Sequence, residues 1–253
     1  MANSPSGESV TQRIVRVLET FDADRPVQTI AEISRRGELP PSTGHRMVAD
    51  LVDSGLLERD DAGRIRLGLR LWELAQRGSR ALRLRQIALP HMEHVQARLR
   101  EHTQLAVLEQ DEALFLERLS NPRAVSNITR IAGRLPLHAS SSGLVLLAHA
   151  DHALRERMLA GPLTAVGPET VTDPDELRTA LERIRRDGVA IAPGSIEDVS
   201  TGIAVPVRDG RTGPVIAALS VVIPRAAPTA GAVDELRSAA VRISAQLTQP
   251  PRT

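Results

Sequence analysis

The sequence contains no cysteine, no lysine and no tyrosine, and its only aromatic residues are Phe21, Trp72 and Phe115. Without cysteine, the chain cannot form a disulfide, a thiol nucleophile, an iron–sulfur cluster or a cysteine-ligated zinc finger. No apolar run approaches the ~18 residues that a membrane span needs. The polar residues 1–9 also lack the basic-then-apolar order of a signal peptide. These absences predict a cytoplasmic protein with no membrane partner.

Basic and acidic residues nearly balance, because 32 arginines face 31 aspartates and glutamates, for a formal net charge of +1. This balance excludes a simple polycation that coats nucleic acid, but it leaves room for a local basic face. The 253 residues, 42% of them hydrophobic, suffice for one large domain or two smaller ones. Composition changes near residue 80, and we expect domains at 9–70 and 86–249, joined by a linker helix at 71–85. That linker belongs to a helical stretch interrupted by Gly78 and Pro90.

Residues 10–53 show three short helical patterns separated by breakers. The first helix carries a stripe of apolar residues at helical spacing, namely Val10, Ile14, Val17, Leu18 and Phe21. Ser9 or Thr11 can cap this helix, and a second, shorter helix follows Thr29 and ends near Gly37. The third helix starts near Pro41, because proline suits the first helical turn.

A hairpin with an arginine face is expected after the third helix. In residues 64–70, apolar and arginine side chains alternate with a period of two, which is typical of a strand with one buried face. Asp61, Ala62 and Gly63 supply the turn before that strand. Three helices followed by such a hairpin have the outline of a winged helix-turn-helix, a DNA-binding fold.

Polar side chains at the start of the third helix and arginines on neighbouring elements are the candidate DNA contacts. Arginine can bond guanine in a bidentate manner, and small hydroxyl side chains reach bases or phosphates. Hairpin arginines would lie over the DNA backbone or in the minor groove. The candidates are Arg35, Arg36, Ser42, Thr43, His45, Arg46, Arg64 and Arg66. Residues 1–80 hold 12 arginines and 12 acidic residues, so charge alone leaves open an ordinary solvated face.

Two runs of the chain are specific enough to indicate a family. They are the core Leu39-Pro40-Pro41-Ser42-Thr43-Gly44-His45-Arg46, within residues 27–46, and the hairpin exit Arg66-Leu67-Gly68-Leu69-Arg70. Both resemble the DNA-binding domain of IclR-type transcriptional regulators, and the resemblance covers nearly the whole chain. It implies an N-terminal winged helix-turn-helix, a linker helix and a C-terminal GAF-like α/β domain that binds an effector. It also implies a homodimer or tetramer, because paired reading helices must reach major-groove faces about 34 Å apart.

The second part of the chain alternates strands and helices. Hairpins are expected to turn at residues 110–112 and 209–213, a further strand is expected at 126–131, and helices are expected at 141–149, 151–159, 174–187 and 232–247. Asp173 before Pro174 is placed to cap the third of these helices. Strands separated by helices on a mostly antiparallel sheet define the α+β class.

Residues 133–143 are the most informative part of the expected effector site, because they follow a strand and open an apolar helix. The free N–H groups and partial positive charge of a helix N-terminus favour a carboxylate. Ser140, Ser141 and Ser142 can add hydroxyl donors, although they can equally serve only to cap the helix. His138 nearby is interpreted as a structural histidine.

The resemblance also implies that this site has lost polar anchors. Family members that sense small organic acids often carry an Asp, a Cys and a Ser-x-Ser pair, which by motif order fall on Ala192, Gly202, Ser220 and Val222. Only Ser220 is retained. The effector is therefore expected to be an organic acid or, more in keeping with this loss, a larger and less polar metabolite. Its expected contacts are Leu135, Leu137, Ser140, Ser141, Ser142, Gly202, Ile203, Ala204, Leu219 and Ser220.

Together these features predict a DNA-binding transcriptional regulator, and we expect a repressor rather than an activator. Its expected partners are operator DNA and a small-molecule effector. An enzyme is not expected, because the chain has no Gly-x-Ser-x-Gly elbow, phosphate loop or dinucleotide fingerprint. No cofactor is expected, and the spacing of His91 and His94 brings no third metal ligand nearby. The alternative is a ligand-sensing or scaffold protein without sequence-specific DNA binding.

Overall fold

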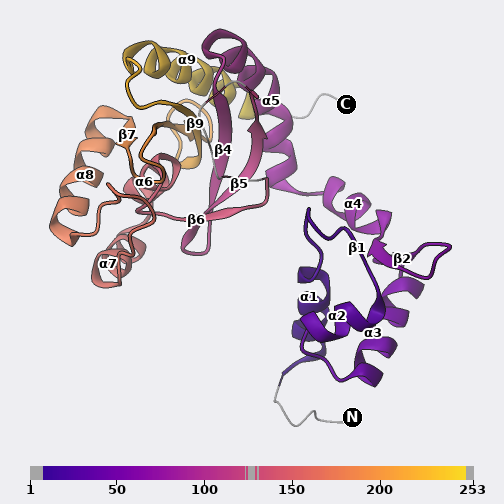
Figure 1. Ribbon diagram of the computed structural model, residues 1–253. Helices are drawn as coiled ribbons and strands as arrows, with labels where there is room; N and C mark the ends of the chain where they lie inside the picture. Colours follow the sequence, from indigo (N-terminus) through magenta and orange to yellow (C-terminus); the bar gives the residue numbers. More distant parts are fainter. Residues whose placement is uncertain (1–7, 123, 125–128, 130, 249–253) are drawn as a thin grey trace. The chain divides into compact units, whose positions relative to one another are not determined.

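The computed structural model describes residues 8–122, 124, 129 and 131–248, and it divides into two compact units, Met1–Arg80 and Ala81–Thr253 (Figure 1). The first unit has one hydrophobic core, and the second has a core on each face of its sheet. No helix in this described part of the chain is long and apolar enough to cross a membrane. The expected class, a helix-turn-helix domain followed by an α/β domain with an antiparallel sheet, is confirmed.

The N-terminal unit has the predicted winged helix-turn-helix outline. Its described elements are α1 (Val10–Glu19), β1 (Val27–Gln28), α2 (Ile30–Arg36), α3 (Pro41–Asp53), β2 (Leu57–Arg59), β3 (Ile65–Leu67) and α4 (Leu69–Gln76). The strands pair antiparallel in the order β1-β3-β2. Side chains from α1, α2, α3 and the hairpin meet in one core. As a result α2 and α3 form the helix-turn-helix, and β2 and β3 form the wing.

Local side-chain caps set where the first two helices begin. The Ser9 hydroxyl accepts the Gln12 N–H, and the Gln12 side chain accepts the Ser9 N–H in return; Thr29 and Glu32 form the same reciprocal pair. These caps could be predicted because both partners lie within four residues. The strand β1 could not be predicted, because two residues show no periodicity and their partners, such as Arg66 opposite Val27, are distant in sequence.

The C-terminal unit is built on one six-stranded sheet. Its described elements are α5 (Arg80–Leu99), β4 (His102–Glu109), β5 (Glu112–Leu119), β6 (Arg134–Pro136), α6 (Ser141–His149), α7 (His152–Ala160), α8 (Pro174–Asp187), β7 (Ala190–Pro193), β8 (Ser200–Arg208), β9 (Val215–Pro224) and α9 (Ala230–Leu247). The strand order is β6-β5-β4-β9-β8-β7, and every described pair is antiparallel.

Helices cover both faces of this sheet. The apolar helix α6 packs on one face, while α5 and α9 pack on the other (Figure 1). Side chains of a strand alternate between the faces. Thus Ile203 and Leu219 belong to the core under α5 and α9, whereas Ala204 and Ala218 belong to the core under α6.

The structure confirms both predicted hairpins and all four predicted helices of this unit, including the Asp173 cap. Pro90 lies inside α5 and does not interrupt it. Proline cannot donate the helical hydrogen bond, but burial of the neighbouring Ala88 and Met92 against the sheet outweighs that loss. The sequence patterns missed the short strands β6 and β7. The strand expected at 126–131 falls mostly outside the described residues. The expected linker at 71–85 spans the end of α4, a break around Gly78 and the start of α5.

Candidate functional site

The first turns of α3 present polar side chains to solvent. Ser42, His45 and Arg46 are exposed and Thr43 is half-buried, while Met47 on the opposite face belongs to the core. Proline at the first position of α3 starts the helix without leaving an unsatisfied N–H group. The helix therefore has the two faces that a reading helix requires, one anchored in the domain and one open to a duplex.

Close contact between α2 and α3 holds this reading helix in place. Gly44 of α3 is buried directly against Ser34 of α2. The Ser34 hydroxyl donates to the Ile30 carbonyl at 2.8 Å, so it is held within its own helix. The absence of a side chain at Gly44 lets the two helices approach while the neighbours of Gly44 face outward.

The exposed cations of the helix-turn-helix differ in how they are engaged. Neither His45 nor Arg46 forms a hydrogen bond or ion pair with any described residue. Arg35 is also exposed, at the end of α2, where its charge lies near Glu32. Arg46 and Arg35 are therefore free to contact DNA without first breaking a strong internal bond.

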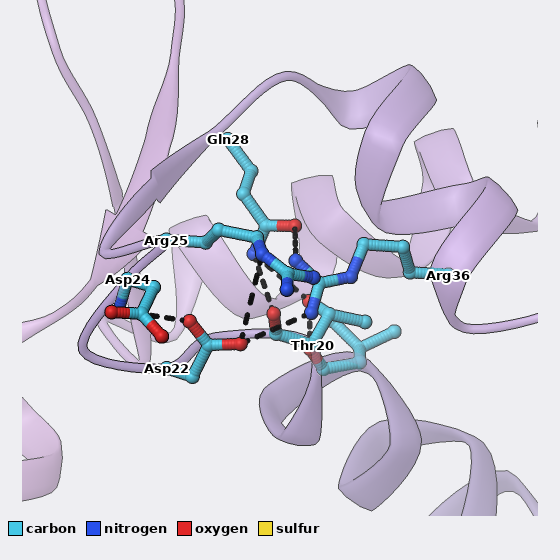
Figure 2. Close-up of polar contacts among 7 residues, drawn as sticks. Thr20, Asp22, Asp24, Arg25, Gln28 and Arg36 are labelled. Carbon is cyan, nitrogen blue, oxygen red and sulfur yellow. Dashed lines mark hydrogen bonds and ion pairs between the residues drawn. The ribbon is translucent and has the colours of Figure 1, made fainter.

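Arg36 has a different environment, shown in Figure 2. Its guanidinium donates to Gln28 Oε1 at 3.1 Å and to Asp22 Oδ2 at 3.2 Å, and the Gln28 amide donates to the Thr20 carbonyl at 2.9 Å. Burial disfavours the charged form of Asp22, but the Arg36 hydrogen bond and the Arg25 charge outweigh it and lower the Asp22 pKa. Arg36 thus ties the end of α2 to β1 and to the end of α1. Sequence reasoning could not separate it from Arg35.

The wing arginines are paired within the wing. Arg64 contacts Asp60 at 3.0 Å, and Arg66 contacts Glu58 at 3.0 Å, yet each arginine side chain remains 56% exposed. Glu58 also accepts the Leu69 N–H at the start of α4 at 3.0 Å. Both arginines can reach a phosphate only by sharing or leaving these carboxylates. They also stabilise the hairpin, a role that their spacing did not reveal.

A cavity of about 30 Å³ lies in the C-terminal unit, between the N-terminus of α6, the sheet and the segment that follows β7. Its polar lining includes Gln104, Thr129, Ser141, Ser195, Glu197 and Ser200. Its apolar lining includes Phe115, Leu135, Ala192, Ile196 and Val222. A cavity of this volume holds roughly one or two water-sized groups. Any larger ligand must therefore displace part of the wall.

The three serines at the start of α6 have three different contacts. Ser140 is the N-cap, because its hydroxyl accepts the Gly143 N–H at 3.0 Å. Ser142 donates to the Ser220 hydroxyl at 2.8 Å, and Ser220 donates in turn to Gln104 Oε1 at 3.3 Å. The Gln104 amide donates to Thr129 in the cavity wall. A chain of polar groups therefore runs from α6 across β9 and β4 to the cavity.

Three positions with small or apolar side chains lie in one row across the sheet. Ala192 of β7 is opposite Gly202 of β8, which is opposite Val222 of β9, and all three line the cavity. These are the positions at which the family resemblance implied lost polar anchors. None of the three side chains carries a polar atom, so this row of the cavity lining is apolar.

Of the ten predicted effector contacts, the cavity is lined by Leu135, Ser140, Ser141, Ser142 and Gly202. Ile203 and Leu219 point to the opposite face, because neighbouring strand residues alternate. Leu137 and Ala204 are packed in the core, and Ser220 lies behind the wall in the polar chain. Sequence reasoning missed Gln104, Phe115 and Thr129 because each comes from an element far from α6 in the chain. Because side chains alternate between the two faces of the sheet, the patterns of β8 and β9 could have predicted Ser200 and Val222 as contacts in place of Ile203 and Leu219.

The segment after β7 closes the cavity and is held on both sides. The Ser195 hydroxyl donates to the Ala139 carbonyl at 2.7 Å, and the Thr170 hydroxyl donates to the Ser195 carbonyl at 2.6 Å. Arg225 contacts Asp198 at 3.0 Å and also contacts Glu169. Backbone bonds hold this closing segment as well, from the Glu169 N–H to the Gly194 carbonyl at 3.0 Å and from the Arg225 N–H to the Val199 carbonyl at 2.9 Å.

His138 is held as a structural group outside the cavity lining. Its Nε2 bonds the Thr164 carbonyl at 2.9 Å, and its ring is buried. Across the described residues, no group of three or more histidines and carboxylates could hold a metal ion.

Comparison with known proteins matches both units. A family model described as bacterial transcriptional regulator IclR C-terminal matches residues 78–248, and one described as IclR helix-turn-helix domain matches residues 10–61. The Pca regulon regulatory protein of Pseudomonas putida is 31% identical over 212 residues, which cover 83% of this chain and 72% of that protein. HTH-type transcriptional regulator KdgR of Escherichia coli is 27% identical over 249 residues, 96% of this chain and 94% of that one.

Solved structures agree with these matches. An IclR homolog from Microbacterium hydrocarbonoxydans, complexed with 4-hydroxybenzoate, is 60% identical, with a TM-score of 0.90 over 94% of this chain and 99% of that chain. An IclR homolog from Microbacterium sp. strain HM58-2 is 57% identical, with a TM-score of 0.65 over 97% of this chain and 100% of that chain.

Proposed function

This chain belongs to the IclR family of bacterial transcriptional regulators, and we propose that it is a cytoplasmic repressor whose effector is a small aromatic acid of the 4-hydroxybenzoate kind. The observation that carries this proposal is the similarity, 60% identity over 94% of the chain, to a homolog complexed with 4-hydroxybenzoate. The lining of the cavity here supports it independently. Its apolar row Ala192–Gly202–Val222 disfavours a small, highly polar keto acid.

The cavity offers a suitable partner for each part of such a ligand. The free N–H groups at the start of α6 favour a carboxylate. Phe115 and Leu135 offer apolar contact for a ring, and the Gln104–Thr129 pair offers donors and acceptors for a phenolic hydroxyl. Because the cavity holds only about 30 Å³, binding must move its wall, and the part that we propose to move is the segment at 194–199, which supplies Ser195, Ile196 and Glu197 to the lining. A ligand that favours the moved wall can shift the protein between two arrangements.

Calorimetry with the full chain tests the effector class. Micromolar binding of 4-hydroxybenzoate or benzoate is the expected result, with weaker or no binding of glyoxylate and pyruvate. The outcome that would overturn the proposal is micromolar binding of either keto acid without binding of the aromatic acids.

On the DNA side, we infer that Ser42, Thr43, His45 and Arg46 face base edges, that Arg35 contacts the backbone, and that Arg64 and Arg66 share their charge with phosphates. A gel shift with the duplex upstream of the gene itself tests this inference. Salt-sensitive binding that 4-hydroxybenzoate weakens is expected for a repressor. If no salt-sensitive binding appears, the alternative of a ligand-sensing scaffold is correct instead.

We also propose that two chains pair through α4. No side chain of α4 is buried in its own unit, and its apolar residues Leu69, Trp72 and Leu74 are 70%, 62% and 49% exposed. An exposed apolar patch of this kind favours association. A pair would also supply two reading helices for two half-sites about 34 Å apart. Sedimentation should show a dimer or tetramer that Trp72→Glu weakens and Trp72→Phe preserves; an unchanged assembly in Trp72→Glu would exclude α4 as the interface.

A further inference from the structure

A second, larger cavity lies at the end of β8, away from the effector cavity. It has a volume of about 480 Å³, within the usual range for small-molecule sites. β7 pairs with β8 only as far as Ala204, so the next residues of β8 lie at an open edge. Pro206 at this edge has no N–H group that would need a strand partner. The cavity shares no lining residue with the effector cavity.

Three arginines line this cavity, which we call the arginine groove: Arg208 from β8, Arg211 from the β8–β9 turn and Arg237 from α9. None of them forms an ion pair with a carboxylate of the described residues. The contacts that they do make are with backbone carbonyls. Arg208 donates to Gly213 at 3.2 Å, and Arg237 donates to Asp187 at 2.7 Å. These bonds hold two of the side chains in place and leave their positive charge uncompensated.

The surroundings of Arg208 are also positive. His149, at the end of α6, has its pKa lowered by burial and further lowered by the charges of Arg208 and Arg185. The charges of Arg208 and Arg185 therefore both lie within electrostatic range of His149, and such a grouping of guanidinium charges favours an anion.

The remaining lining of the groove is largely apolar. Val205 and Pro206 come from β8, and Ala240 and Val241 come from α9. Val241 is 58% exposed although it is hydrophobic. A ligand with an apolar part beside its negative charges can gain further contacts with this lining.

We propose that the arginine groove binds a small organic molecule with two or more negative charges, as phosphate or carboxylate, and that this site is distinct from the effector cavity. Guanidinium groups pair with phosphate and carboxylate oxygens in a bidentate manner. A singly charged aromatic acid would leave most of the three charges unmatched. Such a site lets the regulator respond to a second metabolite through α8, α9 and β8.

Calorimetry on the full chain at low ionic strength tests this proposal with inorganic pyrophosphate and with citrate, one for each anion chemistry. Low salt is needed because exposed charges are screened. We expect saturable binding of at least one probe, weakened about 10- to 100-fold by Arg211→Gln. Arg237→Gln should act in the same direction. Arg211 is exposed and makes no bond with a described residue, so its replacement leaves the fold intact.

Arg242→Gln is the matched control, because it removes the same charge from α9, the helix of Arg237, at a position outside the groove, where Arg242 donates to Ser238 at 2.7 Å. It should bind both probes as the parent chain does. Three results would overturn the proposal: no saturable binding of either probe, an equal loss in Arg242→Gln, or displacement of the probes by 4-hydroxybenzoate. Loss of Arg211-dependent binding when random duplex DNA is added would instead identify the groove as a nucleic-acid contact. The arginine groove stands or falls independently of whether 4-hydroxybenzoate is the effector.

Discussion

Gly44 of α3 lies so close to Ser34 of α2 that a Cβ atom on Gly44 would stand 2.0 Å from the Ser34 Oγ and 2.9 Å from its Cβ. No side chain other than hydrogen fits at that distance. The angle and separation of the two helices therefore depend on this single glycine.

Gly44→Ala is expected to destabilise the N-terminal unit by about 1–3 kcal/mol, because the helices must separate to admit the methyl group. Operator binding in a gel shift should fall with it. The double variant Ser34→Ala/Gly44→Ala should recover part of the loss, since the nearest atom is gone. Gly78→Ala, which meets no atom within 4 Å, is the control. A Gly44→Ala chain as stable as this control would show that the helices are not in such close contact.

Arg46 and Arg36 are expected to fail in different ways when truncated. Arg46→Ala should weaken specific operator binding by about 1–3 kcal/mol, because the side chain has no described internal partner and can read a base. Its unfolding free energy should not change. Arg36→Ala should lower the unfolding free energy by roughly 0.5–1.5 kcal/mol through the lost bonds to Gln28 and Asp22. Denaturant unfolding and gel shifts separate the two, and an equal loss by Arg46→Ala on random DNA would indicate a phosphate contact instead.

Gly202→Ala should weaken effector binding without affecting the DNA-binding unit. The added methyl would stand 2.7 Å from the Ser141 Oγ inside the cavity of about 30 Å³. One extra methylene in a tight pocket changes the free energy of binding by about 1–3 kcal/mol. Calorimetry should therefore show an affinity for 4-hydroxybenzoate that is weaker by at least about 10-fold. Gly231→Ala, where a Cβ meets nothing within 4 Å, should bind as the parent chain does. Unchanged affinity in Gly202→Ala would place the effector elsewhere.

The wing should lose stability in acid. The Leu69 N–H and then Arg66 lower the pKa of Glu58 below its usual 4.5, and the Arg64 N–H does the same for Asp60 below 3.8. Carboxylates with lowered folded-state pKa values stabilise the fold above the unfolded values, and this stabilisation disappears as pH falls through the folded values. Amide hydrogen exchange in β2 and β3 should therefore be constant above about pH 5, after correction for intrinsic rates, and accelerate below pH 4.

Glu58→Gln tests the source of that acid sensitivity. The amide oxygen can still accept the Leu69 N–H, but the side chain no longer titrates or pairs with the Arg66 charge. Between about pH 5 and pH 3.5, a range that spans the unperturbed carboxyl pKa values, amide exchange in β2 and β3 should change less in the variant than in the parent chain. An acid response identical to that of the parent chain would show that other groups control it.

The starts of several helices could be inferred from the sequence, whereas the short strands could not. Helix starts at Ser9, Thr29 and Asp173 depend on partners within four residues, so local patterns predicted them correctly. The short strands β6 and β7 were missed, because they are strands only by virtue of the neighbours with which they pair.

The sequence was also a poor guide to which individual strand residues line the cavity. The predicted pair Ile203 and Leu219 belongs to the far face, while Gly202 and Val222 face the cavity. A shift of one residue along a strand moves a side chain to the opposite face. Sequence patterns identified strands that line this cavity, but they did not settle which of the two alternating sets of side chains faces it.

By itself, the sequence determined the family, the helices, the longer hairpins and the polar edge of α3, because these depend on short-range spacing and on two specific runs of residues. Only the tertiary structure decided which arginines are free and which are bound internally, which face of each strand lines a cavity, and where three arginines without a carboxylate partner among the described residues line one groove. Those outcomes depend on contacts between residues far apart in the chain, such as Arg36 with Asp22 and Arg237 with Asp187. A linear pattern does not encode the distances across which such groups attract or exclude one another.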